Sequence, residues 1–78
     1  MNQHTFESTQ SVVFRGRREE ASRVQRALLS EGIACGIVET LVLGVVGPSM
    51  YLYEVAVAGL DDARARERIR ALGLTAKP

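Results

Sequence analysis

The sequence predicts an α+β domain in which two helices cover one face of a three-stranded, mainly antiparallel sheet. Three segments have the β-branched or alternating patterns of strands, and two have apolar residues at helical spacing. Each helical segment is followed by a glycine, which favours a left-handed helix end. The 78 residues are enough for a single domain of this kind.

The two ends of the chain are predicted to lie outside the domain. Residues 1–10 show neither a strand period nor a helix period, so we expect a flexible N-terminal tail there. The domain is expected over residues 11–74, with a short C-terminal tail at residues 75–78. Its first strand is predicted at residues 12–14, a β-branched and aromatic run that ends before Gly16.

Residues 17–31 predict the first helix, because good helix formers place apolar residues on one face and Gly32 follows them. Glu19 and Glu20 lie in the first turn, where they suit the positive end of the helix dipole. The apolar face consists of Ala21, Val24, Ala27 and Leu28.

The second and third strands are predicted at residues 33–41 and 51–58, where side chains alternate with period two. One predicted face holds Ile33, Cys35, Ile37, Tyr53, Val55 and Val57. The other holds Ala34, Gly36, Val38, Leu52, Glu54, Ala56 and Ala58. Residues 41–50 combine apolar residues with two glycines and a proline, so the pattern allows either longer strands or a loop.

A second helix is predicted over residues 61–72, with Asp61 as its cap and Gly73 at its end. Its apolar line consists of Ala65, Ile69 and Leu72. The pattern leaves open whether a short fourth strand follows Gly73.

This order of elements predicts a split β-α-β-β-α sheet with a right-handed crossover, a ferredoxin-like arrangement without most of its last strand. A VVFRG first strand, a helix that ends in LLSEGI, a glycine-containing hairpin loop and the segment LDDARARERI follow one another over about residues 11–72. In this order they resemble a family of small prokaryotic domains described as signal-transducing proteins. The resemblance implies a fold related to the PII regulators and a role in regulation.

Composition excludes several partner classes. The net charge of +1 produces a weak overall field, which argues against nucleic acid or an acidic membrane surface. The longest apolar run falls far short of the ~20 residues of a membrane helix. One cysteine cannot form an intramolecular disulfide and the first ten residues are polar, so a cytoplasmic location is expected. The four arginines of the predicted second helix flank its apolar line and are expected in water.

Catalytic chemistry has little support among the residue types present. The only histidine, His4, lies in the predicted tail, and the only cysteine, Cys35, alternates with Ile33 and Ile37 as a small buried residue would. A zinc site needs three or four nitrogen or sulfur ligands, more than histidine and cysteine supply here. We therefore predict a protein that is not an enzyme and that binds no metal or other cofactor.

One candidate ligand-binding site is the strand-to-helix turn formed by Arg15, Gly16, Arg17 and Arg18. Three cations and the free N–H groups of a helix start suit an anionic nucleotide or metabolite. Two glutamates in the same first turn would instead pair with the arginines or repel an anion. Binding of a small anionic molecule is therefore the alternative functional prediction.

The apolar connection between the second and third strands is a candidate interface. Leucine, valine and methionine side chains on a surface loop need cover, either from the domain's own sheet or from another copy of the chain. The predicted interface residues are Leu41, Leu43, Val45, Val46 and Met50. The favoured prediction is a regulatory or protein-interaction module that forms a homodimer or homotrimer and binds a further protein partner.

Overall fold

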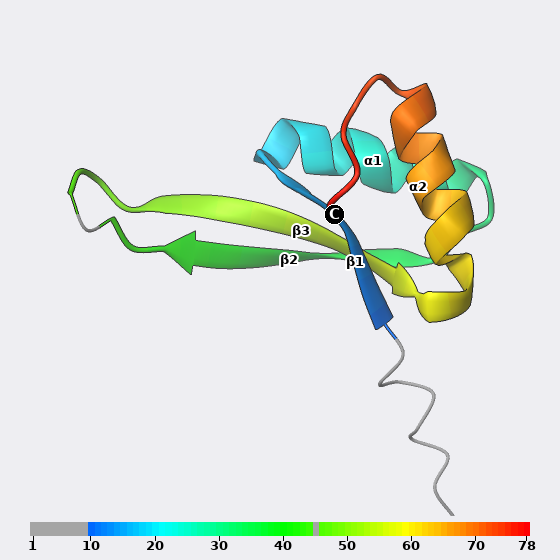
Figure 1. Cartoon of the computed structure of the whole chain (residues 1–78), viewed down its shortest axis with the longest axis horizontal. Helices are drawn as coiled ribbons and strands as arrows, with labels where there is room; N and C mark the ends of the chain where they lie inside the picture. The colour runs from blue at the N-terminus through cyan, green and yellow to red at the C-terminus, as the bar shows by residue number, and fades with distance from the viewer. Residues whose placement is uncertain (1–9, 45) are drawn as a thin grey trace, which may run out of the picture.

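The computed structural model describes residues 10–44 and 46–78 (Figure 1). Its elements in chain order are β1 (Gln10–Gly16), α1 (Arg18–Ser30), β2 (Cys35–Val42), β3 (Met50–Ala58), the short 3-10 turn η2 (Gly59–Asp61) and α2 (Asp62–Ala71). The predicted α+β class and the predicted helices and strands are confirmed. Val45 and residues 1–9 of the predicted tail lie outside the described residues.

The sheet has the strand order β1-β3-β2, and β3 pairs antiparallel with both neighbours. Val55 on β3 is opposite Phe14 on one side and Ile37 on the other. Both helices lie on the same side of this sheet (Figure 1). The arrangement is consistent with a small ferredoxin-like domain. β1 begins at Gln10, opposite Ala58, so Gln10 belongs to the sheet and not to the predicted tail.

The core lies between the helices and one face of the sheet. Its buried residues are Val13, Phe14, Ala21, Val24, Leu28, Ile33, Val55, Val57, Ala65 and Ile69. The register of β1 shifts between Val12 and Phe14, which leaves Val13 as an extra residue in a β-bulge. Because of this bulge, consecutive residues Val13 and Phe14 are both buried, whereas a regular strand would expose one of them.

Both helices end in the left-handed glycine motif that the sequence predicts. Gly32 has φ +78°, and the Ile33 amide donates to the Leu28 carbonyl at 2.9 Å. Since this bond holds Ile33 in the helix end, β2 begins at Cys35 and not at Ile33 as predicted. Gly73 ends α2 in the same way, with φ +82°.

The start of α2 differs from the prediction. Asp61 occupies the N-cap position, but it is also the last residue of η2 and has φ −98° and ψ 3°. An N-cap normally has extended backbone that directs its side chain to the first helical amides. Asp61 instead lies 3.8 Å from the Arg64 guanidinium as an ion pair.

The β2–β3 hairpin extends well beyond the end of β1 (Figure 1). β1 ends at Gly16, opposite Tyr53, whereas β2 and β3 stay paired as far as Val42 and Met50. We call the two-stranded part beyond β1 the arm, residues 40–44 and 46–52. The open question of the sequence is thus resolved: Leu41, Val42 and Met50 belong to strands, and a loop follows only after Val42.

A matched pair of leucines tests the packing of α1. Leu28 is fully buried, whereas its neighbour Leu29 is 52% exposed. We expect Leu28→Ala to lower the free energy of unfolding by about 2–5 kcal/mol, because it leaves a cavity in the core. Leu29→Ala should cost less than about 1 kcal/mol. Urea unfolding followed by circular dichroism measures both, and equal losses would contradict the described orientation of α1.

Candidate functional site

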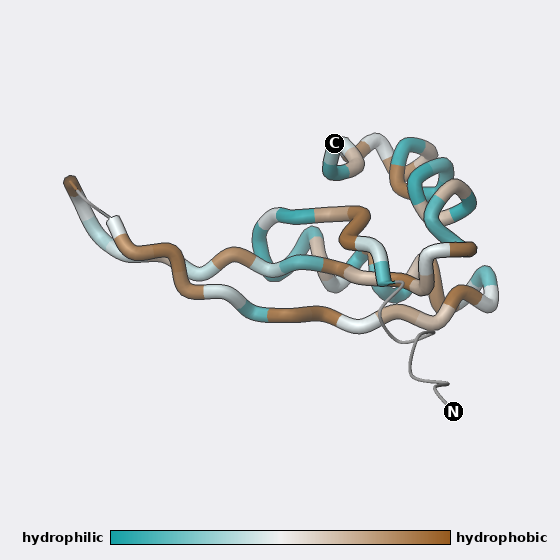
Figure 2. Tube along the Cα trace, turned by 60° about the horizontal axis from the view of Figure 1, so that its bottom comes forward, coloured by the Kyte–Doolittle hydropathy of each residue, from teal (hydrophilic) through white to brown (hydrophobic). Residues whose placement is uncertain are grey.

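The arm exposes a large share of the chain's apolar side chains. Among its residues, Leu43 is 71% exposed and Val46 is 96% exposed. The other exposed apolar residues of the arm are Leu41, Val42, Met50 and Tyr51, each between 39% and 55% exposed. Figure 2 shows apolar positions along both of its strands. The arm therefore carries four of the five predicted interface residues, and the fifth, Val45, lies outside the described residues.

The arm is apolar on both of its faces. Leu41 is opposite Tyr51 on the side of the sheet that carries the helices, and Val42 is opposite Met50 on the other side. Such a two-stranded ribbon is only marginally stable alone in water. Tyr51 was not expected among the apolar residues of this connection, because only the register of β1 and β2 on β3 shows that it lies beyond β1.

One polar contact marks the base of the arm. The Tyr53 hydroxyl donates a hydrogen bond to Glu39 Oε2 at 3.0 Å, between directly opposite residues of β3 and β2. This bond and the charge of the Glu39 carboxylate raise the pKa of Tyr53, so the phenol keeps its proton. The bond ties the two strands together where the cover of β1 ends.

The turn of the hairpin requires glycine. A Cβ on Gly44 would lie 2.6 Å from the Gly47 carbonyl oxygen and 2.7 Å from that of Pro48. Both contacts are too short for real Cβ atoms, and because both oxygens belong to the backbone, they cannot move aside as a flexible side chain would. Gly47 has φ +110°, a conformation that other residues rarely adopt. The glycines therefore shape a tight hairpin end that presents Leu43 and Val46 to solvent.

The structure separates the predicted anion-binding residues. Arg15 pairs with Glu54 at 2.6 Å, across the β1–β3 ladder. It also lines a surface hollow of about 390 Å³ with the C-terminal residues 75–78. Arg18 lines a different hollow of about 510 Å³ along the outer face of α1. Arg15 and Arg18 therefore line different hollows.

The N-terminus of α1 already holds a carboxylate. Glu20 Oε1 accepts a hydrogen bond from the Arg17 backbone amide at 3.4 Å. A Cβ on Gly16 would lie 2.8 Å from the same oxygen and 2.9 Å from the Phe14 ring, so Gly16 lets this carboxylate approach the backbone. Glu20 thus places a negative charge beside the helix start, which opposes the binding of a further anion there.

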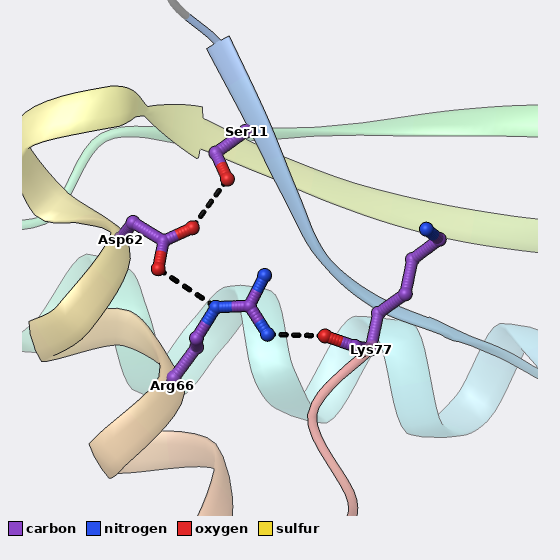
Figure 3. A network of polar contacts seen from close by, with 4 residues as sticks. All are labelled: Ser11, Asp62, Arg66 and Lys77. Atoms are coloured by element: carbon purple, nitrogen blue, oxygen red, sulfur yellow. Dashed lines mark hydrogen bonds and ion pairs between the residues drawn. The ribbon is translucent and has the colours of Figure 1, made fainter.

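A polar network ties the C-terminal residues to β1 (Figure 3). The Ser11 hydroxyl donates to Asp62, and Asp62 also accepts from Arg66 Nε at 2.7 Å. Arg66 in turn donates to the Lys77 carbonyl oxygen, and the Lys77 amide donates to the Val13 carbonyl oxygen at 2.8 Å. The predicted C-terminal tail is therefore fixed at the outer edge of β1 by a single ladder bond, without becoming a regular strand.

The arrangement of this network indicates a structural role. The Ser11 hydroxyl donates directly to a carboxylate, whereas nucleophilic serines are activated by a positioned base such as histidine or lysine. The Ser11 bond, followed by the Arg66 contact, lowers the pKa of Asp62 and keeps it charged. The network joins the start of β1, the first turn of α2 and the C-terminal residues.

Cys35 lies partly buried on the helix-covered side of β2. Its Sγ lies 3.7 Å from the Gln25 carbonyl oxygen, and burial raises the pKa of the thiol. The thiolate, which is the reactive form of cysteine, is thus disfavoured. Within residues 10–44 and 46–78, no group of three or more histidine, cysteine or acidic side chains is placed to hold a metal ion. His4 lies outside these residues.

No helix among the described residues is long and apolar enough to cross a membrane. Comparison of the chain with protein-family models, curated proteins and solved structures finds no match.

The lowered pKa of Asp62 predicts acid sensitivity of the fold. The carboxyl titrates below its ordinary value of 3.8 in the folded chain, so the unfolded chain binds more protons near that pH. The contribution of Asp62 to the free energy of unfolding is complete above its ordinary pKa. It is lost as the pH falls through the lowered pKa of the folded chain. We expect the urea midpoint of the wild type to fall over this acid range.

The matched variants are Asp62→Asn and Glu67→Gln, which each remove one carboxyl of α2. Asp62→Asn should flatten the acid part of the profile and lower the midpoint at neutral pH. Glu67→Gln changes an exposed residue and should leave the shape of the profile unchanged. Identical profiles for wild type and Asp62→Asn would contradict the assigned role of the network.

Proposed function

We propose that this protein is a self-associating, non-enzymatic interaction module of the regulatory kind, and that the arm is its association surface. The carrying observation is the exposure of apolar side chains on both faces of the arm, from Leu41 to its tip at Leu43 and Val46. Contiguous apolar surface of this sort typically marks a site of protein association. The family resemblance of the sequence supports the regulatory part of the proposal.

The energetics favour cover of the arm by another chain. If Leu43 and Val46 bury about half of their apolar surface, each contributes about 1 kcal/mol per chain before the cost of association is subtracted. A domain of this size buries only about 60% of its chain surface on folding, so such amounts matter for its stability. The proposed domain is ferredoxin-like and PII-like, with its hairpin used for contact and not as a long polar effector loop.

The non-enzymatic part of the proposal rests on the chemistry of the residues described above. Cys35 is protected by burial, and Ser11 donates to a carboxylate without an intervening base. Each group has a structural partner in the fold. An interaction module needs no activated nucleophile, and the exposed apolar arm is the feature that such a role uses.

Substitution at the tip tests the association surface. We expect Leu43→Asp and Val46→Asp to reduce the sedimenting mass to that of one chain and to leave the helical circular-dichroism signal intact, because a buried charge is costly at an apolar contact. Leu60→Asp is the matched control, since Leu60 is 90% exposed but lies in η2, far from the arm along β3. Wild-type protein that sediments as one chain at every concentration would refute self-association.

The alternative function, recognition of an anionic nucleotide or metabolite at Arg15–Arg18, has a separate test. Because Glu20 places a negative charge beside the helix start and Arg15 pairs with Glu54, we expect ATP and inorganic phosphate to leave the amide resonances of residues 15–20 unchanged at moderate salt. A chemical-shift titration measures this. Saturable shifts confined to these residues, abolished by Arg18→Ala, would favour the alternative function.

A further inference from the structure

The two outer edges of the sheet differ in how they are protected. The edge of β1 has a bulge at Val13, and the carbonyl of the same residue accepts the Lys77 amide. The other edge is β2, whose eight residues pair with β3 without a register shift. Within residues 10–44 and 46–78, no backbone group of β2 bonds to any segment other than β3. The fold thus covers part of one edge and leaves the other open.

The sequence of β2 carries little of the usual protection of an edge strand. Natural edge strands are kept apart by lysine, proline, bulges or short length. β2 has the sequence CGIVETLV, in which Glu39 is the only charged residue. The Glu39 carboxylate is directed toward β3, where it accepts the Tyr53 hydroxyl. The unpaired N–H and C=O groups along such a regular edge are matched by another strand, because a strand presents the same groups at the same spacing.

We propose that this edge pairs with β2 of a second copy of the chain, antiparallel and about a two-fold axis perpendicular to the sheet. Two three-stranded sheets then form one sheet of six strands in the order β1-β3-β2-β2-β3-β1. A strand edge paired in this way is complementary to itself. The pairing also gives Leu41 and Val42 of the arm a neighbouring strand, which a two-stranded ribbon lacks. The inference rests on the proposed self-association and names the contact that produces it.

Pairing of β2 with β2 closes the assembly at two chains. The two-fold axis uses the open regular edge of both copies. The outer edges that remain belong to β1, where the bulge at Val13 and the contact with Lys77 interrupt a further ladder. A dimer is therefore expected, and continued growth of the sheet is opposed.

Side-chain alternation and charge select the register of the two strands. Directly opposite residues of antiparallel strands point to the same face, so the axis passes beside one residue of β2, which is opposite its own copy. An axis at Val38 pairs residues 35–41 and an axis at Glu39 pairs residues 36–42, whereas any other axis pairs a shorter part of β2. An axis at Glu39 sets two carboxylates opposite each other, which is unfavourable. The axis therefore lies at Val38.

This register covers apolar side chains on both sides of the sheet. Val38, which is 54% exposed, meets Val38 of the second copy on the side away from the helices. On the helix side, Leu41 is opposite Cys35 of the second copy, and Cys35 packs against the core of its own chain. The base of each arm thus borders the core of the other chain. Antiparallel pairing over residues 35–41 also forms about six to eight backbone hydrogen bonds.

Cysteine cross-linking tests the register. In a Cys35→Ala background, Val38→Cys should form a disulfide between chains, because opposite Cβ atoms of adjacent strands lie about 5 Å apart, close to disulfide geometry. Thr40→Cys is the matched control: Thr40 is exposed on the same side of β2 but would lie about 14 Å along the strand from its copy. We expect Val38→Cys to cross-link about tenfold faster or more under mild oxidation. Mass spectrometry without reductant measures both rates.

Charge at the axis tests the pairing without a covalent bond. Val38→Lys and Val38→Glu each set like charges opposite each other, so each alone should weaken self-association by about tenfold or more. Their equimolar mixture should recover the affinity as a heterodimer. Thr40→Lys, which is opposite Gly36 in this register, should weaken association by less than about threefold. Sedimentation gives the affinities, and circular dichroism checks that every variant is folded.

Amide hydrogen exchange separates pairing of strand edges from contact through a sheet face. Backbone amides of β2 that point away from β3 should exchange more slowly in the wild-type dimer than in monomeric Val38→Lys, because a new ladder protects them. Equal exchange rates for these amides in dimer and monomer would refute the pairing of the two edges.

The outcomes distinguish this inference from the proposed function. If the wild type is a dimer, Leu43→Asp is monomeric and Val38→Lys remains a dimer, edge pairing is refuted and association through the tip of the arm stands. If Val38→Cys cross-links as expected and Leu43→Asp remains a dimer, edge pairing stands and the tip is not the association surface. Faster cross-linking of Thr40→Cys than of Val38→Cys refutes the register. A wild type that is monomeric throughout refutes both proposals, and the edge of β2 would then be assigned to a strand of a different protein.

Discussion

The pairing of β3 on both of its edges is the constraint on which the rest of the structure depends. Its antiparallel ladders hold β1 and β2 in one sheet, and its buried residues Val55 and Val57 form the floor on which both helices pack. β2 and β3 stay paired beyond the point where β1 ends, so their hairpin extends past the three-stranded part of the sheet. The arm is thus a consequence of unequal strand lengths.

The two faces of the sheet have different roles. One face is covered by α1 and α2 and accounts for the buried core. The other face holds the cross-strand pair Arg15–Glu54 within apolar surroundings. In a chain of 78 residues, a core on only one face of the sheet gives a small margin of stability, because small domains bury a smaller fraction of their surface than large ones. Association through the arm would supply burial that the single chain lacks.

The open edge of β1 is only partly closed. The C-terminal residues reach it through the Lys77 amide and are held there by Arg66, which Asp62 and Ser11 position. This polar network holds the C-terminal residues at β1, where a longer ladder of backbone hydrogen bonds would otherwise be needed. The attachment of this segment therefore depends on the ionisation of Asp62. At the start of α2, Asp62 is therefore the carboxylate that joins this helix to β1, whereas the predicted cap Asp61 pairs only with Arg64 of the same helix.

The sequence by itself determined the features that depend on near neighbours. Alternation placed Val55 and Val57 on one face, and Gly32 and Gly73 marked the helix ends, because side-chain direction and left-handed backbone are local properties. Only the tertiary structure decided how far the hairpin extends beyond β1, and that Arg15 pairs with Glu54, 39 residues away. It also showed that the Glu20 carboxylate accepts a hydrogen bond from the Arg17 amide, directly before α1. These features depend on strand register and on contacts between distant segments, which residue spacing along the chain does not encode.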